Sequence, residues 1–345
     1  MTHASDDGVS QPTGKSRKRL LILLSVLVLL GIVRILMPPM PSDTVRSALS
    51  PVQVVSAESA KGFDMQGLTI PKDEIYNGGP GKDGIPALMK PEFGTVMNTT
   101  YLRPDDELIG VVIGDESRAY PLRVLVWHEI VNDTVGGVPI AVTYCPLCGT
   151  AMVFDRRVND QVLTFGVSGL LYQSDVLFYD HQQNGLWSQL ELAAVSGPLA
   201  GAALTWLPSK RTRWSHWRKA YPESQVLTKK TGYARDYDEM PYGGYEEDPK
   251  TIFPVPNKRT ELSTKTWVVG LLVNGAAQAY PKTFFNEAGG QPIEDTIGGV
   301  SVRIGRDEVS GAIRATTAGG EVLPVVEVYW FAWQAFYPNT GLHSE

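Results

Sequence analysis

The two cysteines of this chain, Cys145 and Cys148, stand three positions apart in the sequence CPLCGTA. A C-x-x-C pair serves either as a metal chelate or as a redox dithiol. The proline and the following glycine resemble half of a rubredoxin-type or zinc-ribbon knuckle, in which backbone N–H groups point at the sulfurs and the glycine permits a positive φ. Knuckles of this kind usually occur in pairs. Because this one is single, we expect any further metal ligands to be other residue types.

The segment before the cysteines predicts a partner for them. Two β-prone runs flank Gly136-Gly137, which is typical of a two-residue hairpin turn. Counting outward from this turn places His128 opposite Cys145, in a non-hydrogen-bonded pair whose Cβ atoms lie roughly 4.5–5.5 Å apart. The sequence therefore predicts a Cys2His metal site of His128, Cys145 and Cys148, with copper or zinc as the metal. Glu129 is expected to face the other way, because neighbours alternate along a strand.

A fourth ligand is sought in the stretch after the cysteine turn, which carries Asp175, Asp180, His181, Trp187 and Gln189. His181 follows Tyr179-Asp180 at a predicted turn, and as a fourth ligand it would complete a Cys2His2 set. Three protein ligands with an open position would permit catalysis. A fourth ligand would close the site and make it structural or a metal carrier.

The N-terminal region predicts attachment to a membrane. Residues 1–19 form a basic tail, residues 20–37 are an apolar run interrupted by Arg34, and residues 38–72 read as a linker rich in Pro, Ser and Ala. The basic cluster should keep the tail in the cytoplasm. The sequence thus predicts a single-pass protein of the inner membrane, the membrane itself being its partner through residues 20–37. The domain after the anchor would lie outside the cytoplasm. The net charge of −6 argues against nucleic-acid binding.

The rest of the chain contains an internal repeat. The segments IGVVIGDESRAYP and DTVGGV of a first unit (residues 73–232) match VGLLVNGAAQAYP and DTIGGV of a second, shorter unit (residues 263–345). Residues 233–262 would form a crossover loop between them. We expect a mainly β or α+β fold of two related, hairpin-rich units with short helices. In the second unit the predicted ligands are replaced together: His128 by Gly290, Cys145 by Asp307 and Cys148 by Ser310.

These motifs resemble a known family. The strings WHEIVND, YCPLCGTA, FGVSGLLYQSDVLFYD and the later W-x-x-W-x-x-x-YP element are similar to the bacterial and archaeal family called domain of unknown function 3179. The resemblance covers most of residues 68–342 and is most specific at CPLCGTA. It implies an exported protein and supports reading His128, Cys145 and Cys148 as a set. It supplies no activity.

Three functional hypotheses follow. The first is a metalloprotein of envelope redox chemistry or metal handling. The second is a thiol–disulfide oxidoreductase that uses the C-x-x-C pair. The third is a non-catalytic envelope binding or scaffold protein in which the cysteines form a passive disulfide, although a bridge closing so short a loop stabilises a fold little. The residues leave open whether the protein is an enzyme, and they do not indicate a protein or small-molecule partner.

Overall fold

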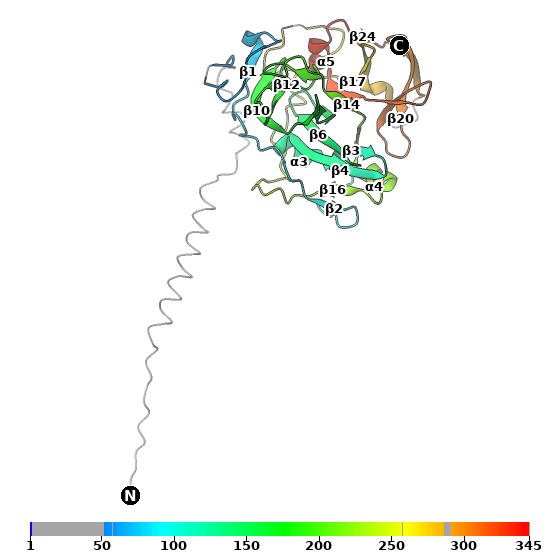
Figure 1. Cartoon of the computed structure of the whole chain (residues 1–345). Coiled ribbons are helices and arrows are strands. Elements are labelled where there is room, and N and C mark those ends of the chain that lie inside the picture. The colour runs from blue at the N-terminus through cyan, green and yellow to red at the C-terminus, as the bar shows by residue number, and fades with distance from the viewer. Residues whose placement is uncertain (2–51, 57, 257, 286–290, 345) are drawn as a thin grey trace. The chain divides into compact units, whose positions relative to one another are not determined.

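The structure is a computed structural model that describes residues 1, 52–56, 58–256, 258–285 and 291–344 (Figure 1). The predicted anchor at 20–37 and Gly290 lie outside these residues. Within the described part of the chain, no helix is both long and apolar enough to cross a membrane.

Three sheets and a small hairpin make up the first unit, and the prediction of a mainly β fold with short helices is confirmed. The first sheet has the order β15 (Lys210–Arg213), β3 (Glu107–Ile113), β4 (Glu116–Pro121), β16 (Gln225–Leu227), β2 (Phe93–Thr95). The second has the order β14 (Thr205–Leu207), β7 (Thr150–Asp155), β6 (Val138–Cys145), β5 (Ile130–Val135). The third has the order β1 (Ile75–Asn77), β10 (Phe165–Tyr172), β11 (Asp175–Asp180), β12 (Leu186–Ser188), β13 (Ala193–Ala194), and β8 (Arg157–Val158) pairs with β9 (Gln161–Val162).

The second unit has two sheets. One has the order β23 (Val326–Tyr329), β17 (Trp267–Val273), β18 (Ala276–Pro281), β24 (Gly341–Leu342). The other has the order β19 (Ile293–Ile297), β20 (Val300–Arg306), β21 (Ile313–Thr317), β22 (Val322–Leu323). Within the described residues the helical elements are short: η1 (Lys72–Glu74), α3 (Leu122–His128), α4 (Trp214–Ala220), η2 (Lys282–Phe285) and α5 (Trp330–Phe336). Between β16 and β17 the described residues form neither helix nor strand, as expected of a crossover.

The predicted Gly-Gly hairpin is confirmed, including its register. Gly136 and Gly137 have φ values of 54° and 75°, and β5 pairs with β6 from Val135↔Val138 to Ile130↔Thr143. Pairing stops there, because the residues before β5 belong to helix α3, which is buried along its whole length. Glu129, with φ 55°, ends this helix and turns the chain into the strand. The predicted placement of His128 opposite Cys145 is therefore wrong.

The two units share specific contacts. In each, one strand pairs antiparallel and a later strand pairs parallel with the central hairpin, β3–β4 or β17–β18. Gly110 of the first unit leaves room for the ring of Trp217, because a Cβ there would lie 2.0 Å from the ring. Gly270 does the same for Trp333, at 2.4 Å. Duplication of one ancestral unit would produce this agreement, and it remains a prediction.

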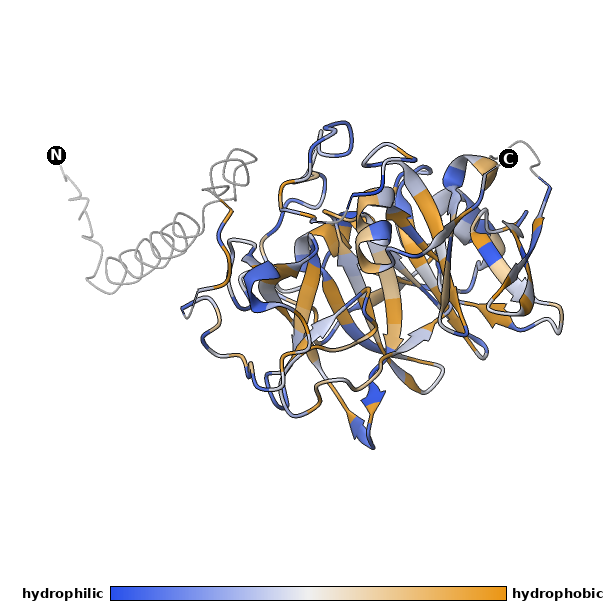
Figure 2. Cartoon of the chain, turned by 90° about the horizontal axis from the view of Figure 1, so that it is seen from above, coloured by the Kyte–Doolittle hydropathy of each residue, from blue (hydrophilic) through white to orange (hydrophobic). Residues whose placement is uncertain are grey.

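The main hydrophobic core contains both cysteines. It gathers residues from β6, β7, β10, β11 and β12 with others from β17, β23 and α5, including the fully buried Trp187, Trp330 and Trp333. Apolar stretches, coloured orange, run along many strands of the folded part of the chain (Figure 2). The cysteine turn is thus held from both units rather than displayed at the surface.

Candidate metal centre

The cysteine turn connects two strands and has close packing on its outer side. Cys145 ends β6 and pairs with Thr150 at the start of β7. Gly149 has φ 70°, and a Cβ on it would lie 2.4 Å from the Trp267 ring, so glycine is required both by the backbone and by the space. The carbonyl of Cys148 accepts a hydrogen bond of 2.9 Å from the backbone N–H of Tyr329. Both cysteines are free thiols, 1% and 0% exposed.

Asp175 completes a three-residue cluster with the cysteines. One oxygen of its carboxyl group and the two sulfurs all lie within 4.8 Å of one another. Asp175 opens β11 after a tight turn of Gln173 and Ser174, both in the left-handed region with φ of 52° and 68°. The Cys148 thiol donates to the carbonyl of Ser174 at 3.1 Å. The tip of the β10–β11 hairpin is therefore what brings a carboxyl group to the dithiol.

A buried polar network holds Asp175 on one side only. Thr150 Oγ1 lies 3.2 Å from Asp175 Oδ1 and 2.6 Å from Gln189 Oε1. The Gln189 amide donates in turn to Thr143 Oγ1 at 2.8 Å. Asp175 is 1% exposed, yet its Oδ2 atom has no hydrogen-bond partner among the described residues. A buried carboxyl oxygen without a partner is costly, and it marks a position where a ligand would be stabilised.

Acidic groups gather at this point of the core. Burial raises the pKa of Asp175 to about 7 and, with help from Asp175, that of Glu129 to about 8. Burial also raises the pKa of the Cys145 thiol, and that of the Cys148 thiol well above its usual range. Apart from burial, the main effects on the pKa values of these four groups come from the charges of the other members and from local hydrogen bonds. No described lysine or arginine is among them.

His128 lies elsewhere. Its Nδ1 is 2.7 Å from the carbonyl oxygen of Pro86, and its Nε2 is 2.8 Å from the hydroxyl of Tyr237. Burial lowers its pKa to about 4, so the ring is neutral, donating through Nδ1 and accepting from the tyrosine. Because both nitrogens already have protein partners, the structure does not bring His128 into the cysteine cluster.

His181 is also separate from the cluster. It follows β11, and its exposed ring stacks on Tyr179 with the centroids 5.0 Å apart and the planes 6° from parallel. The metal-ligand roles predicted for His128 and His181 stay predictions, and the described geometry favours Asp175 in their place.

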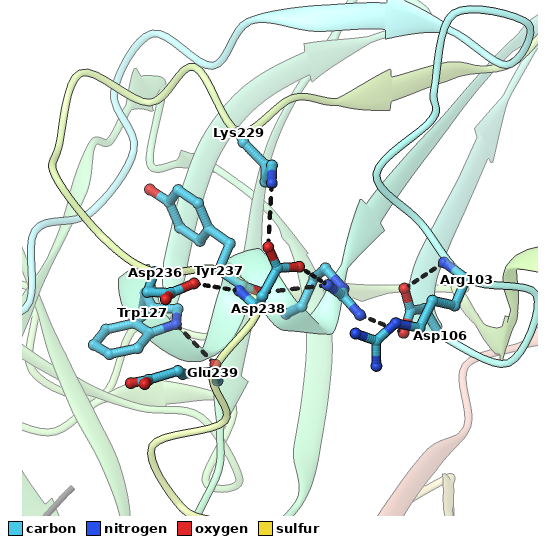
Figure 3. Close-up of polar contacts among 9 residues, drawn as sticks. Arg103, Asp106, Trp127, Lys229, Asp236, Tyr237, Asp238 and Glu239 are labelled. Atoms are coloured by element: carbon cyan, nitrogen blue, oxygen red, sulfur yellow. Dashed lines mark hydrogen bonds and ion pairs between the residues drawn. The ribbon is translucent and has the colours of Figure 1, made fainter.

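The crossover loop covers this region. Arg123 of α3 pairs with Asp106 at 2.6 Å and with Asp238 of the loop at 2.7 Å (Figure 3). The indole of Trp127, also on α3, donates to the carbonyl of Glu239 (Figure 3). Further along the loop, Tyr242 and Tyr245 pack against the core that contains the cysteines, and burial followed by nearby acidic groups raises both of their pKa values. The loop therefore closes the site from one side.

The second unit keeps the turn without its sulfurs. Asp307 and Ser310 occupy the positions of Cys145 and Cys148, and the Asp307 Oδ1 atom accepts from the Ser310 N–H at 2.7 Å and from its hydroxyl at 2.6 Å. Gly311 repeats the positive φ of Gly149, at 67°. The turn folds with a carboxylate–hydroxyl pair in place of two thiols.

A comparison with protein-family models assigns the chain to a family. The model of a family described as a protein of unknown function, DUF3179, matches residues 82–340. The chain belongs to the DUF3179 family. The match spans the cysteine turn, Asp175, Glu129 and the crossover loop, so the whole cluster lies in the family's domain. No curated protein and no solved structure matched the chain in the corresponding comparisons.

Proposed function

We propose that this DUF3179 protein binds one metal ion through Cys145, Cys148 and Asp175. The observation that carries the proposal is the unpartnered Oδ2 atom of Asp175, buried beside two free thiols whose sulfurs lie within 4.8 Å of a carboxyl oxygen. Two thiolates and a carboxylate are a ligand set that zinc accepts in tetrahedral geometry. A protein ligand or a water molecule would take the fourth position.

The charges support a cation. With all protons removed, Cys145, Cys148, Asp175 and Glu129 would place four negative charges in a buried space. Such a group is tolerated either with its protons bound or with a cation in their place. A divalent ion would displace the thiol protons and lower the energy of the ionised carboxylates. Glu129, at the end of α3, is a further carboxyl group that a bound ion would influence, since the charge of Asp175 already acts on its pKa.

Between the two metals, the ligand set favours zinc. Cuprous copper prefers soft sulfur and imidazole ligands, whereas Zn(II) also accepts carboxylate oxygen. An imidazole ligand from His128 would have favoured copper. The two ring nitrogens of His128 instead form hydrogen bonds with Pro86 and Tyr237.

The test is metal content with matched variants. Full-length protein, purified with zinc and copper supplied, would be analysed by elemental mass spectrometry beside Cys145→Ser, Asp175→Asn and His128→Gln. We expect near one zinc per chain, lost in Cys145→Ser, strongly reduced in Asp175→Asn and retained in His128→Gln. Cobalt substitution would then show a thiolate-to-metal charge-transfer band in the wild type. A metal-free wild type would overturn the proposal. Metal lost on His128→Gln but kept on Asp175→Asn would restore the Cys2His set.

Thiol–disulfide exchange is the second candidate, and one observation favours it. A buried carboxyl group with a pKa of about 7, one oxygen of which lies within 4.8 Å of both sulfurs, can accept a thiol proton at neutral pH. In such a cycle two thiols would reduce a substrate disulfide, giving the Cys145–Cys148 disulfide, two substrate thiols and no net proton release. Against it stand the raised thiol pKa values and the burial of both sulfurs, since reactive cysteines are usually thiolates that substrates can reach.

The same variants separate the two candidates. Equilibration of metal-free protein with mixtures of reduced and oxidised glutathione, followed by alkylation of free thiols, measures the reduction potential of the pair. A reversible two-electron transition near the potential of the glutathione buffer, in protein that binds no metal, would move thiol–disulfide exchange to first place.

We further propose that residues 20–37 anchor the chain in the inner membrane with the metal site outside the cytoplasm, and that the two units arose by duplication. The basic tail before the apolar run supports the orientation. Matching contacts support the duplication: the hydroxyls of Tyr120 and Tyr280 each donate to an aspartate, Asp133 or Asp295, at 2.6 Å. A fusion of alkaline phosphatase to the C-terminus should be active in a Gram-negative host if the orientation is right.

A further inference from the structure

A cavity of about 550 Å³ lies between the two units, apart from the cysteine cluster. One side is formed by β3, the start of β6 and the β14–β15 connection. The other side is formed by β21, β22 and the residues that follow them. Its volume falls within the range of natural small-molecule sites.

The walls of this cavity are mostly apolar and partly open. Val112 and Val322 are 39% and 38% exposed, which is unusual for large aliphatic side chains on strands of a packed sheet. Leu207, Leu323 and Val325 line the same space and are half-buried. Covering hydrated apolar surface of a cavity with an apolar ligand lowers the free energy, so this surface favours binding.

Cations at the cavity are not fully neutralised. Arg157 pairs with Asp155, whereas Lys210 and Arg314 make no ion pair or side-chain hydrogen bond among the described residues. Asp307 is the remaining acid of the lining, and its Oδ1 atom already accepts from Ser310. Burial lowers the pKa of Lys210, the Asp307 carboxylate opposes this effect, and repulsion from Arg314 adds to it.

We propose that this inter-unit cavity binds an amphipathic organic anion, with its apolar body on Val112, Val322 and Leu207 and its anionic group at Lys210 and Arg314. The anion would relieve the repulsion between the two cations and form charge-assisted hydrogen bonds with them. The apolar body would cover the exposed valines. An inorganic anion would interact with the two cations but leave the valines exposed, whereas a neutral apolar molecule would cover the valines but leave the cations without an anion.

The test uses naphthalene-2-sulfonate as the probe, with the uncharged 2-naphthalenemethanol as its matched control. Binding to the full-length chain in neutral-lipid nanodiscs would be measured by isothermal titration calorimetry. Variants would be Lys210→Met, Arg314→Met, Val322→Trp, which fills the mouth from an exposed position, and Lys90→Met, an exposed cation outside the lining.

We expect saturable binding of one sulfonate per chain and much weaker binding of the alcohol. Each cation variant should weaken sulfonate binding roughly tenfold, the loss of one charged hydrogen bond. Val322→Trp should abolish binding, and Lys90→Met should leave it unchanged. No saturable heat, equal binding of the alcohol, or equal affinity in all four variants would overturn the proposal. Since no metal ligand is changed, the outcome is independent of the metal site.

Discussion

Protonation of His128 should destabilise the folded protein as the pH falls from 6.5 toward about 4. The ring is fully buried between Pro86 and Tyr237, and its pKa falls from an ordinary 6.5 to about 4. The unfolded chain therefore binds a proton at a pH where the folded chain does not. The contribution is fully present above pH 6.5 and is lost as the pH falls toward 4.

The magnitude follows from these two values. Between pH 8 and pH 5 the free energy of unfolding should fall by about 2 kcal/mol because of this ring alone, and by about 3 kcal/mol at still lower pH. Glu129 and Asp175 act in the opposite sense. Their folded-state pKa values, about 8 and about 7, are raised, so their contributions are present at low pH and are lost as the pH rises. The pH dependence of the free energy of unfolding therefore combines opposing contributions. The contribution of His128 is obtained only by comparing the wild type with a variant that lacks this ring.

The assay is urea unfolding followed by tryptophan fluorescence, at pH 8 and pH 5, with a chelator present to remove metal. His128→Gln keeps an amide that can bond to the same neighbours but does not titrate. We expect the wild type to lose about 2 kcal/mol more than the variant between the two pH values. Parallel losses would refute the argument. If the variant does not fold, an NMR titration of the wild-type ring tests it directly, since a pKa near 6.5 would contradict the buried, neutral state.

Three further predictions concern packing and access. Gly110→Ala should cost about 3 kcal/mol in chemical unfolding, because its Cβ would overlap the Trp217 ring, whereas Gly319→Ala, at an open position, should change little. Arg123→Met should detach the crossover loop from α3 and speed limited proteolysis between residues 233 and 256, with thermal unfolding shifted only slightly; unchanged cleavage would show that the packed tyrosines alone hold the loop. In native, metal-free protein the two cysteines should react with a thiol reagent more than about tenfold more slowly than a free cysteine, and full reactivity without denaturant would contradict their burial.

The sequence predicted the local features of this fold and missed the long-range ones. Gly136-Gly137 was sufficient for the hairpin register, because a two-residue turn with both φ values positive permits one pairing. The register count extends the strand back to His128, whereas the structure begins β5 at Ile130 and places Leu122–His128 in a helix. Short apolar runs rich in branched residues are ambiguous between strand and buried helix, and here packing between two sheets decides for helix α3.

The position of Asp175 beside the cysteines could not be predicted for a related reason. Asp175 follows Gln173-Ser174, a turn without the glycine that usually marks a hairpin, and its approach to the cysteines depends on one sheet packing against another. The only local signal is an acidic residue placed directly after a turn within an apolar run, YQSDVLFYD. Glu129 was set aside on the assumption of strand alternation, which the end of α3 removes.

The Asp307–Ser310 turn of the second unit suggests how folding and the proposed metal binding are related in this protein. A turn of the same backbone shape closes there with a carboxylate and a hydroxyl, inside the same kind of hairpin. If the proposed duplication is right, the knuckle of the first unit should also form without an ion, unlike small zinc domains that are unfolded without metal. We then expect the proposed metal to bind to and leave a folded chain, and the Cys145→Ser variant to fold. By the same reasoning, we expect Asp307→Cys combined with Ser310→Cys to place a dithiol on the turn of the second unit.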